Sequence, residues 1–296
     1  MNTAKVFLMM TGLVLLFMAI GYYFGGQSGM ILAFAIACVM NFIAYWASDK
    51  MVLKMYRAIE VKPGERGKPG LLYDVVRNIA TINGMPMPRV YVIPTKAPNA
   101  FATGRNAEHA AVAATEGLLE ILNREELEGV MGHEMAHVKN KDMLIGTIAA
   151  TFVGAIGILA SLARWGAIFG GYSRDERGGG GGGIGLLVAA LLAPFMAILL
   201  QTAISRQREY KADAIGGRLG APGGRHLQLA SALQKIHQAP YRLNLDDRPG
   251  TANLMIANPL SGRGLTNLFS THPPLEKRIA KLKEHAQQAV YQGYAG

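Results

Sequence analysis

The chain has 296 residues, of which 50% are apolar and only 17% charged, with a mean hydropathy of +0.19. This composition is more apolar than that of an ordinary soluble protein, in which about 25% of residues are charged. The formal net charge of +10 is spread along the chain and not clustered with aromatic residues, which argues against a nucleic-acid-binding function. Cys38 is the single cysteine, so an intramolecular disulfide is excluded.

Four segments contain no Asp, Glu, Lys or Arg: residues 6–24, 29–48, 143–163 and 184–205. About 20 apolar residues, at roughly 1.5 Å rise each, span the core of a bilayer, so each segment predicts a transmembrane helix. The first segment could instead be a cleaved signal peptide, but it lacks an evident cleavage site and a second apolar run follows at once. All four segments could instead be buried helices of a large soluble core, and the last two could also line a cavity or lie at the membrane interface.

The distribution of Lys and Arg predicts the orientation of these segments. Most basic residues near the segment ends fall on the same side as both termini, whereas the opposite side receives Arg164, Arg174 and Arg177. Basic residues favour the cytoplasmic side, so we expect both termini and the polar blocks in the cytoplasm. The same charges favour contact with anionic lipid headgroups, which makes the bilayer an expected partner.

The chain therefore divides into a transmembrane hairpin (1–48), a polar block (49–142), a second hairpin (143–205) and a polar tail (206–296). In the polar block, "GLLYDVVRNIATING" has apolar residues at helical spacing, and "PRVYVIP", "NAFATG" and "AAVAATEG" are typical of the short strands of a small sheet. The glycine run 178–183 lacks the Lys-Ser/Thr of a phosphate loop and predicts a flexible linker.

The stretch "NREELEGVMGHEMAHV" predicts a helix that carries a metal site. Asn123 is a favourable N-cap, and Glu126 stands where it can return the capping bond. His133 and His137 share one face of this helix, so their ring nitrogens can reach one ion at about 2.0–2.1 Å. Glu134 stands beside that ion, in position to take a proton from a bound water molecule.

A catalytic zinc commonly has three protein ligands and a free position for water. The best candidate for the third ligand is Glu209 in "SRQREYKAD", with Asp213 four residues on to accept the other ring N–H of a ligating histidine. The alternative is that these carboxylates belong to a solvated charged face. Two apolar segments separate His137 from Glu209, and two crossings return the chain to the same side of the bilayer. The remaining histidines at 109, 226, 237 and 285 lack a second ligand at useful spacing.

Five stretches resemble the HtpX-type membrane zinc metalloproteases, which are related to the CAAX prenyl protease family. They are "NAFATG", "TEGLLEIL", "ELEGVMGHEMAHVKNKD", "SRQREYKAD" and "THPPLEKRI", in the order found in that family. The resemblance extends over nearly the whole chain. It implies an α+β fold, with four transmembrane helices and a mainly helical gluzincin-like protease domain that carries a small β-sheet.

The resemblance also implies roles for particular residues. One Zn²⁺ per chain would be held by His133, His137 and Glu209, with Glu134 catalytic and Asp213 supporting a ligand. The strand at Asn99, Ala100 and Phe101 would be an edge that holds the substrate backbone in extended form. His272 would stabilise the tetrahedral intermediate, although it could also be a plain helix-entry residue, and Arg206 would support the site electrostatically.

The expected function is that of a zinc-dependent metalloendopeptidase in the bacterial inner membrane. The resemblance implies that its substrates are membrane or unfolded proteins, damaged or misassembled, which are cut at the cytoplasmic face as quality control under stress. One alternative is a membrane-bound assembly or holdase factor with a structural zinc, but such sites typically have four protein ligands, often cysteines. Another is a transporter, which would carry charged residues inside its spans. The sequence leaves the natural substrate, the cleavage preference and the oligomeric state open.

Overall fold

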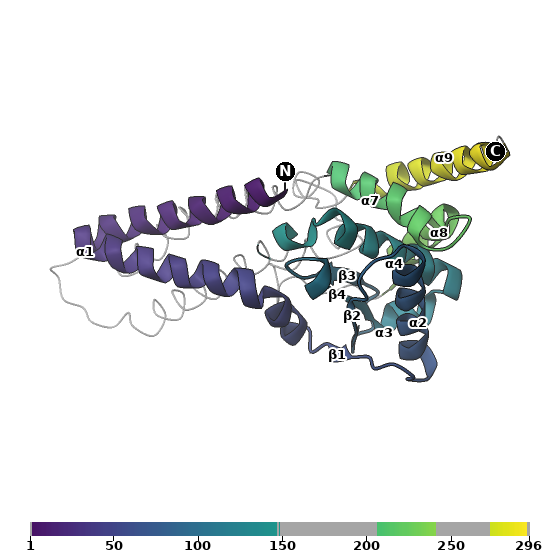
Figure 1. The fold of residues 1–296 in the computed structure, drawn as a ribbon, viewed down its shortest axis with the longest axis horizontal. Coiled ribbons are helices and arrows are strands. Elements are labelled where there is room, and N and C mark those ends of the chain that lie inside the picture. Colours follow the sequence, from purple (N-terminus) through teal and green to yellow (C-terminus); the bar gives the residue numbers. More distant parts are fainter. Residues whose placement is uncertain (1, 147, 149–205, 241–272, 295–296) are drawn as a thin grey trace.

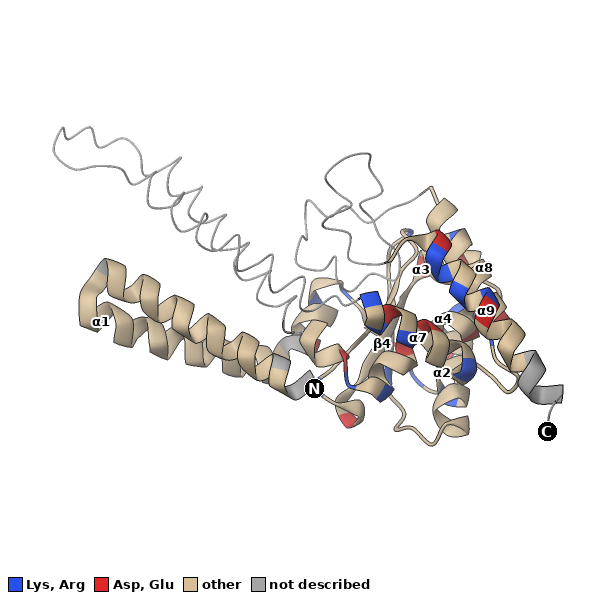
Figure 2. Cartoon of the chain, turned by 90° about the horizontal axis from the view of Figure 1, so that it is seen from above, with Lys and Arg blue, Asp and Glu red and all other residues tan. Residues whose placement is uncertain are grey.

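The computed structural model describes residues 2–146, 148, 206–240 and 273–294. A long helical hairpin extends away from a folded unit made of helices and a small sheet (Figure 1). The residues coloured as charged lie on the folded unit, whereas the hairpin α1 is almost entirely tan (Figure 2).

The hairpin is α1 (Asn2–Met55), which reverses at Gly26, where the backbone leaves the helical region (φ 59°, ψ −145°). Its two arms touch where Gly21 meets Gly29, and neither position has room for a side chain. Asn41 donates a hydrogen bond across the hairpin to the carbonyl of Met10 (3.1 Å), which satisfies a polar group in an apolar setting. Glycine therefore sets the close approach of the arms.

Two parts of α1 are long and apolar enough to cross a membrane: Val6–Tyr23 and Gly25–Ala47, with mean hydropathies of 2.1 and 2.0. Only 17% of each window is buried within the protein, so most of their apolar surface faces outward, as lipid contact requires. The first predicted pair of spans thus corresponds to two candidate spans, although the second helical arm continues past residue 48 to Met55.

Four transmembrane helices were expected, and two candidate spans are found in the described residues. Most of the third segment and the whole of the fourth, together with the glycine run 178–183, lie outside these residues. The start of the third segment is described: Ile145 and Ile148 are buried against Val6, Leu13 and Ala44 at the open end of the hairpin. This contact ties the hairpin to the chain that follows the metal-site helix.

The sheet is small and mixed, with strand order β1-β2-β4-β3. The strands are β1 (Ile59–Glu60), β2 (Arg89–Ile93), β3 (Ala100–Thr103) and β4 (Ala111–Thr115). β2 and β4 are parallel, while β1 and β3 are antiparallel to β2 and β4 respectively, with Phe101 opposite Ala113. The three predicted strand segments are therefore confirmed, and β1 is an addition that the sequence analysis missed.

Both faces of the sheet are covered. This is seen at β4, whose small and β-branched residues are buried throughout. Val112 and Ala114 face the main core of helices, whereas Ala111 and Ala113 face Tyr56 and Phe101 at the base of α1. The last turns of the membrane hairpin thus form part of the second core of the folded unit.

The helices of the folded unit are α2 (Gly67–Ile82), α3 (Glu116–Ile121), α4 (Arg124–Asn140), α7 (Arg206–Leu219), α8 (His226–Gln238) and α9 (Leu275–Tyr294), with a 3₁₀ turn η1 (Ala107–His109). α4 lies in the middle and contacts α2, α7, α8 and β3. A side chain at Gly132 of α4 would overlap the carbonyl of Gly216, and one at Gly216 of α7 would overlap the backbone of His133. These glycines bring α4 and α7 to backbone contact.

Candidate metal centre

The predicted capping of α4 is present in full. Glu126 N–H donates to Asn123 Oδ1 (2.9 Å), and Asn123 N–H donates to Glu126 Oε2 (3.0 Å). Glu126 also accepts bonds from Ser231 Oγ (2.7 Å) and Lys235 Nζ (2.8 Å) on α8. The helix that carries both histidines is thereby fixed at its start to a neighbouring helix.

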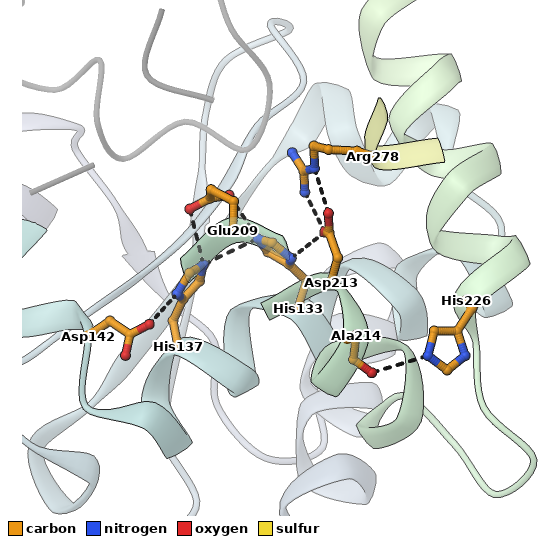
Figure 3. A network of polar contacts seen from close by, with 8 residues as sticks. All are labelled: His133, His137, Asp142, Glu209, Asp213, Ala214, His226 and Arg278. Carbon is orange, nitrogen blue, oxygen red and sulfur yellow. Dashed lines mark hydrogen bonds and ion pairs between the residues drawn. The ribbon is translucent and has the colours of Figure 1, made fainter. Parts of the chain in front are cut away.

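Three possible ligand atoms meet between α4 and α7 (Figure 3). The Nε2 atoms of His133 and His137 are 3.3 Å apart. Glu209 Oε2 lies 3.6 Å from Nε2 of His133, and Oε1 lies 3.7 Å from Nε2 of His137. Two bonds of about 2.0–2.1 Å at a tetrahedral angle separate their ligand atoms by about 3.4 Å, so this spacing fits a zinc ion.

Each histidine is held from behind by a carboxylate, as metal-ligating histidines commonly are. Nδ1 of His133 lies 2.9 Å from Asp213 Oδ1, although the ring N–H does not point squarely at that oxygen. Nδ1 of His137 lies 3.3 Å from Asp142 Oδ2. Both rings consequently turn Nε2 towards the shared position next to Glu209 (Figure 3).

The site is electrostatically prepared for a cation. Burial lowers the pKa of His137, but its hydrogen bond to Asp142 and the charges of Glu209 and Glu134 outweigh burial and raise the pKa to about 9. The raised pKa means that negative charge is concentrated around this imidazole. A divalent cation is the ligand that such a pocket would stabilise.

Arg278 anchors the carboxylate behind His133. It reaches from α9, is 2% exposed, and donates from Nε to Asp213 Oδ2 (2.8 Å) and from Nη2 to Oδ1 (2.7 Å). Burial would raise the pKa of Asp213, but the adjacent guanidinium outweighs it and holds that pKa below its usual range. Asp213 therefore stays ionised and in place behind the His133 ring.

Sequence reasoning missed both Asp142 and Arg278. Asp142 follows the end of α4 closely, so a carboxylate five residues after a ligating histidine was a signal that could have been used. Arg278 lies in the stretch "THPPLEKRI", but no local pattern indicated that α9 would lie beside α7.

Glu134 is buried at 4% exposure and makes no hydrogen bond or ion pair with any residue that the structure describes. The carboxylates of Glu126, Glu128 and Asp213, by contrast, are all bonded to a cationic partner. A buried carboxylate that is not tied up in this way is free to accept a proton from a bound molecule.

The predicted substrate strand lies at the end of the described sheet. Ala100 and Phe101 belong to β3, which pairs with β4 and borders no other described strand, and α4 packs against it. Asn99 precedes β3 and is tied to Thr115, whose Oγ1 accepts from the Asn99 N–H (2.9 Å). The edge is thus close to the helix that carries the histidines.

Two further predicted residues are not brought to the site by the described structure. Arg206 is exposed at the first residue of α7, and its role stays a prediction. Arg208, two residues further, interacts electrostatically with Asp142 and Glu209. Burial lowers the pKa of Arg208, and these two carboxylates oppose that lowering. His272 lies outside the described residues.

Comparisons with known proteins agree with this geometry. The model of peptidase family M48 matches residues 68–286. The chain is 52% identical over 282 residues to the "Protease HtpX homolog" of Desulfatibacillum aliphaticivorans, covering 95% of this chain and 89% of that protein. The proteins of the same name from Persephonella marina and Thermococcus kodakarensis are 51% and 50% identical, over 97% of this chain and 99% and 96% of theirs.

Among solved structures, the chain is similar to Ste24p of S. mikatae, with a TM-score of 0.52 and 18% sequence identity. The likeness covers 92% of this chain and 62% of Ste24p, so the chain spans less than two thirds of that protein. At this identity the likeness shows a shared fold. The family match and the near full-length relatives go further: this chain belongs to peptidase family M48 and is a membrane metalloprotease of the HtpX type.

Proposed function

We propose that the protein is an endopeptidase whose single zinc ion is held by His133, His137 and Glu209, and that it cuts membrane or unfolded proteins at the cytoplasmic face. The observation that carries this proposal is the convergence of two imidazole nitrogens and a carboxylate at tetrahedral spacing, next to Glu134. A zinc ion bound there would polarise the scissile carbonyl and lower the pKa of a bound water towards about 7.

Other side chains of the protein transfer the proton and orient the ligands. Glu134 accepts the proton of the attacking water and passes it to the leaving amine nitrogen, because it is buried beside the ligands and makes no bond to a described residue. Asp213 and Asp142 fix the ring orientation of the two histidines. His272 as a partner of the developing oxyanion rests on the family resemblance alone.

The edge strand β3 supports a way of holding the substrate. An extended peptide that pairs with Ala100 and Phe101 adds a strand to the sheet and gains backbone hydrogen bonds without a fixed sequence. Asn99 lies at the start of this edge, bonded to Thr115. Such pairing suits a protease that acts on unfolded segments.

The place of the site supports action at a membrane surface. α4 ends at Asn140, and Ile145 and Ile148 already pack against the open end of the apolar hairpin. The excess of basic residues on this side favours the cytoplasmic face of the inner membrane. We infer substrates among damaged or misassembled membrane proteins, which expose unfolded loops at this level.

A cleavage assay tests the proposal. Full-length protein in detergent is incubated with unfolded casein, with and without a zinc chelator, beside Glu134→Gln and the matched variant Glu125→Gln. Glu125 is exposed in the first turn of the same helix, so this control changes the same chemical group away from the ligands. We expect Glu134→Gln to keep its zinc and lose cleavage, and Glu125→Gln to cleave normally.

Cleavage at the normal rate by Glu134→Gln would remove Glu134 from its role. Zinc retained without any peptidase activity in the parent protein would favour the alternative of an assembly or holdase factor with a structural ion. A second experiment asks on which face of the membrane cleavage takes place. In cells, a cleavable test segment is placed either on the cytoplasmic or on the extracytoplasmic side of the hairpin. Cleavage on the extracytoplasmic side would contradict the proposed orientation.

A further inference from the structure

An open pocket of about 640 Å³ lies where the membrane hairpin enters the folded unit, between the last turns of α1 and β2. Its lining includes the cationic side chains of Lys50, Lys54, Arg57 and Arg89 and no acidic residue. This pocket is separate from the metal centre, whose ligands come from α4 and α7. We call it the basic pocket.

Three of the four cations of the basic pocket have no ion-pair partner in the described parts of the chain. Arg89 pairs with Asp49 at 2.7 Å, which accounts for one charge. Lys50, Lys54 and Arg57 are exposed and form no ion pair with any residue that the structure describes. Like charges that converge on one cavity repel each other, and an anion in the cavity relieves that repulsion.

The basic pocket begins at the level of lipid headgroups. The candidate span ends at Ala47, and Lys50 lies three residues further, about 4.5 Å along the helix axis. The headgroup layer is about 5–8 Å thick on each side of the hydrocarbon core, so Lys50 falls within it. The backbones of Lys54 and Arg57, about 10 and 15 Å beyond the end of the span, lie past this layer on the side of the folded unit. Trp46, on the last turn of the span, is a typical interfacial residue and stacks under the guanidinium of Arg105 at 4.5 Å.

The backbone at Arg57 decides which substitution the position tolerates. Arg57 N–H donates to Lys54 O (3.0 Å) and Ala58 N–H donates to Leu53 O (2.9 Å), which is the Schellman pattern at a helix end. Arg57 occupies the left-handed position of this pattern (φ 52°), where glycine is usual and other residues are strained. Glycine can therefore replace Arg57 without straining the backbone, and this change removes the side chain that lines the pocket.

We propose that the basic pocket binds the phosphate group of an anionic phospholipid. A lipid is the favoured source, because Lys50 of the pocket lies within one turn of the end of the span, where headgroup phosphates are concentrated. The pocket is formed jointly by α1 and β2, so a bound headgroup would fix the folded unit at a set height against the membrane. This inference does not depend on the zinc site or on its proposed function.

The test measures lipid retained by the full-length protein in neutral detergent. Phosphatidylglycerol and phosphatidylcholine are offered in equal amounts, and the bound lipid is quantified by native mass spectrometry. The pocket variants are Lys54→Gln and Arg57→Gly, and the matched control is Lys283→Gln, an exposed lysine on α9. Glycine suits the left-handed position, so Arg57→Gly is expected to fold at least as well as the parent protein.

We expect the parent protein and Lys283→Gln to retain phosphatidylglycerol in preference to phosphatidylcholine. Each pocket variant should retain about fivefold less phosphatidylglycerol, the change expected for one cation near an anionic surface. Equal retention of the two lipids, or unchanged retention by both pocket variants, would overturn the proposal. In a parallel arm, inorganic phosphate is added without lipid. Pocket-dependent thermal stabilisation by phosphate, without selective lipid retention, would assign the pocket to a free anion and overturn the lipid assignment.

Discussion

The membrane hairpin and the metal centre both bring two helices together through glycine, but for different purposes. Gly21 and Gly29 let two apolar arms touch, and most of the surrounding side chains face outward. Gly132 and Gly216 let α4 and α7 touch, and these two helices carry the buried side chains of His133, Glu209 and Asp213. The first contact serves packing, whereas the second sets the spacing of ligand atoms, so the two should respond differently to substitution.

The largest effect should come from the charge that supports the metal centre. Arg278→Met leaves Asp213 buried at 1% exposure without its cation, and breaking a buried pair in this way costs about 3–5 kcal/mol. We expect a lower free energy of unfolding, measured by denaturation in detergent, and weaker zinc binding by the folded fraction. Lys277→Met, the exposed neighbour, is the control. Parental stability and zinc affinity in Arg278→Met would show that Asp213 does not need its guanidinium.

The glycine contacts should separate the two regions most clearly. Gly216→Ala places a Cβ against the backbone of His133, and overpacking of this kind costs about 1–3 kcal/mol. Because α7 must shift, we expect zinc content well below one ion per chain and loss of peptidase activity. Gly21→Ala should lower thermal stability but leave zinc content unchanged.

Gly25→Ala serves as the hairpin control, because a Cβ there meets no atom within 4 Å. If Gly21→Ala removed zinc as completely as Gly216→Ala does, the hairpin contact would not be a matter of packing alone.

A smaller effect is expected behind His137. Asp142→Asn keeps the size of the side chain but removes the charge that orients the ring, 3.3 Å from Nδ1. Loss of such a partner typically lowers metal affinity by about 10- to 100-fold. The apparent zinc dissociation constant, measured by competition with a chelator, should rise by this factor while the thermal stability of the zinc-loaded protein changes little. An unchanged zinc dissociation constant would show that groups other than Asp142 orient the His137 ring.

The smallest effect is a pH dependence confined to the folded unit. Burial raises the pKa of Glu126, but bonds from Lys235, the Asn123 backbone and Ser231 outweigh burial and lower it. A depressed carboxylate pKa gives stability that is present above the unfolded value of about 4.3 and lost as pH falls through the folded value. Thermal stability should therefore decline below about pH 5, and Lys235→Met should flatten this decline. The same slope in both proteins would contradict the role of Glu126.

Local patterns predicted the parts of the protein that depend on neighbouring residues in the chain. The capping of α4, the shared face of His133 and His137, and the apolar hairpin all follow from helical periodicity and residue type. Glu209 was proposed because a third ligand was needed, and because its spacing from Asp213 places both carboxylates on one face of a helix. Asp142 and Arg278 were missed because their roles arise from how a helix end and α9 pack onto the site, which no short pattern reports.

Zinc-edge X-ray absorption of purified, never-chelated protein tests the central claim most directly. We predict one zinc per chain, bound by two imidazole nitrogens and a carboxylate oxygen at about 2.0–2.2 Å, with the carboxylate contribution and most of the zinc lost in Glu209→Ala. One zinc per chain with the same spectrum in Glu209→Ala, or a spectrum without imidazole scattering, would contradict the account.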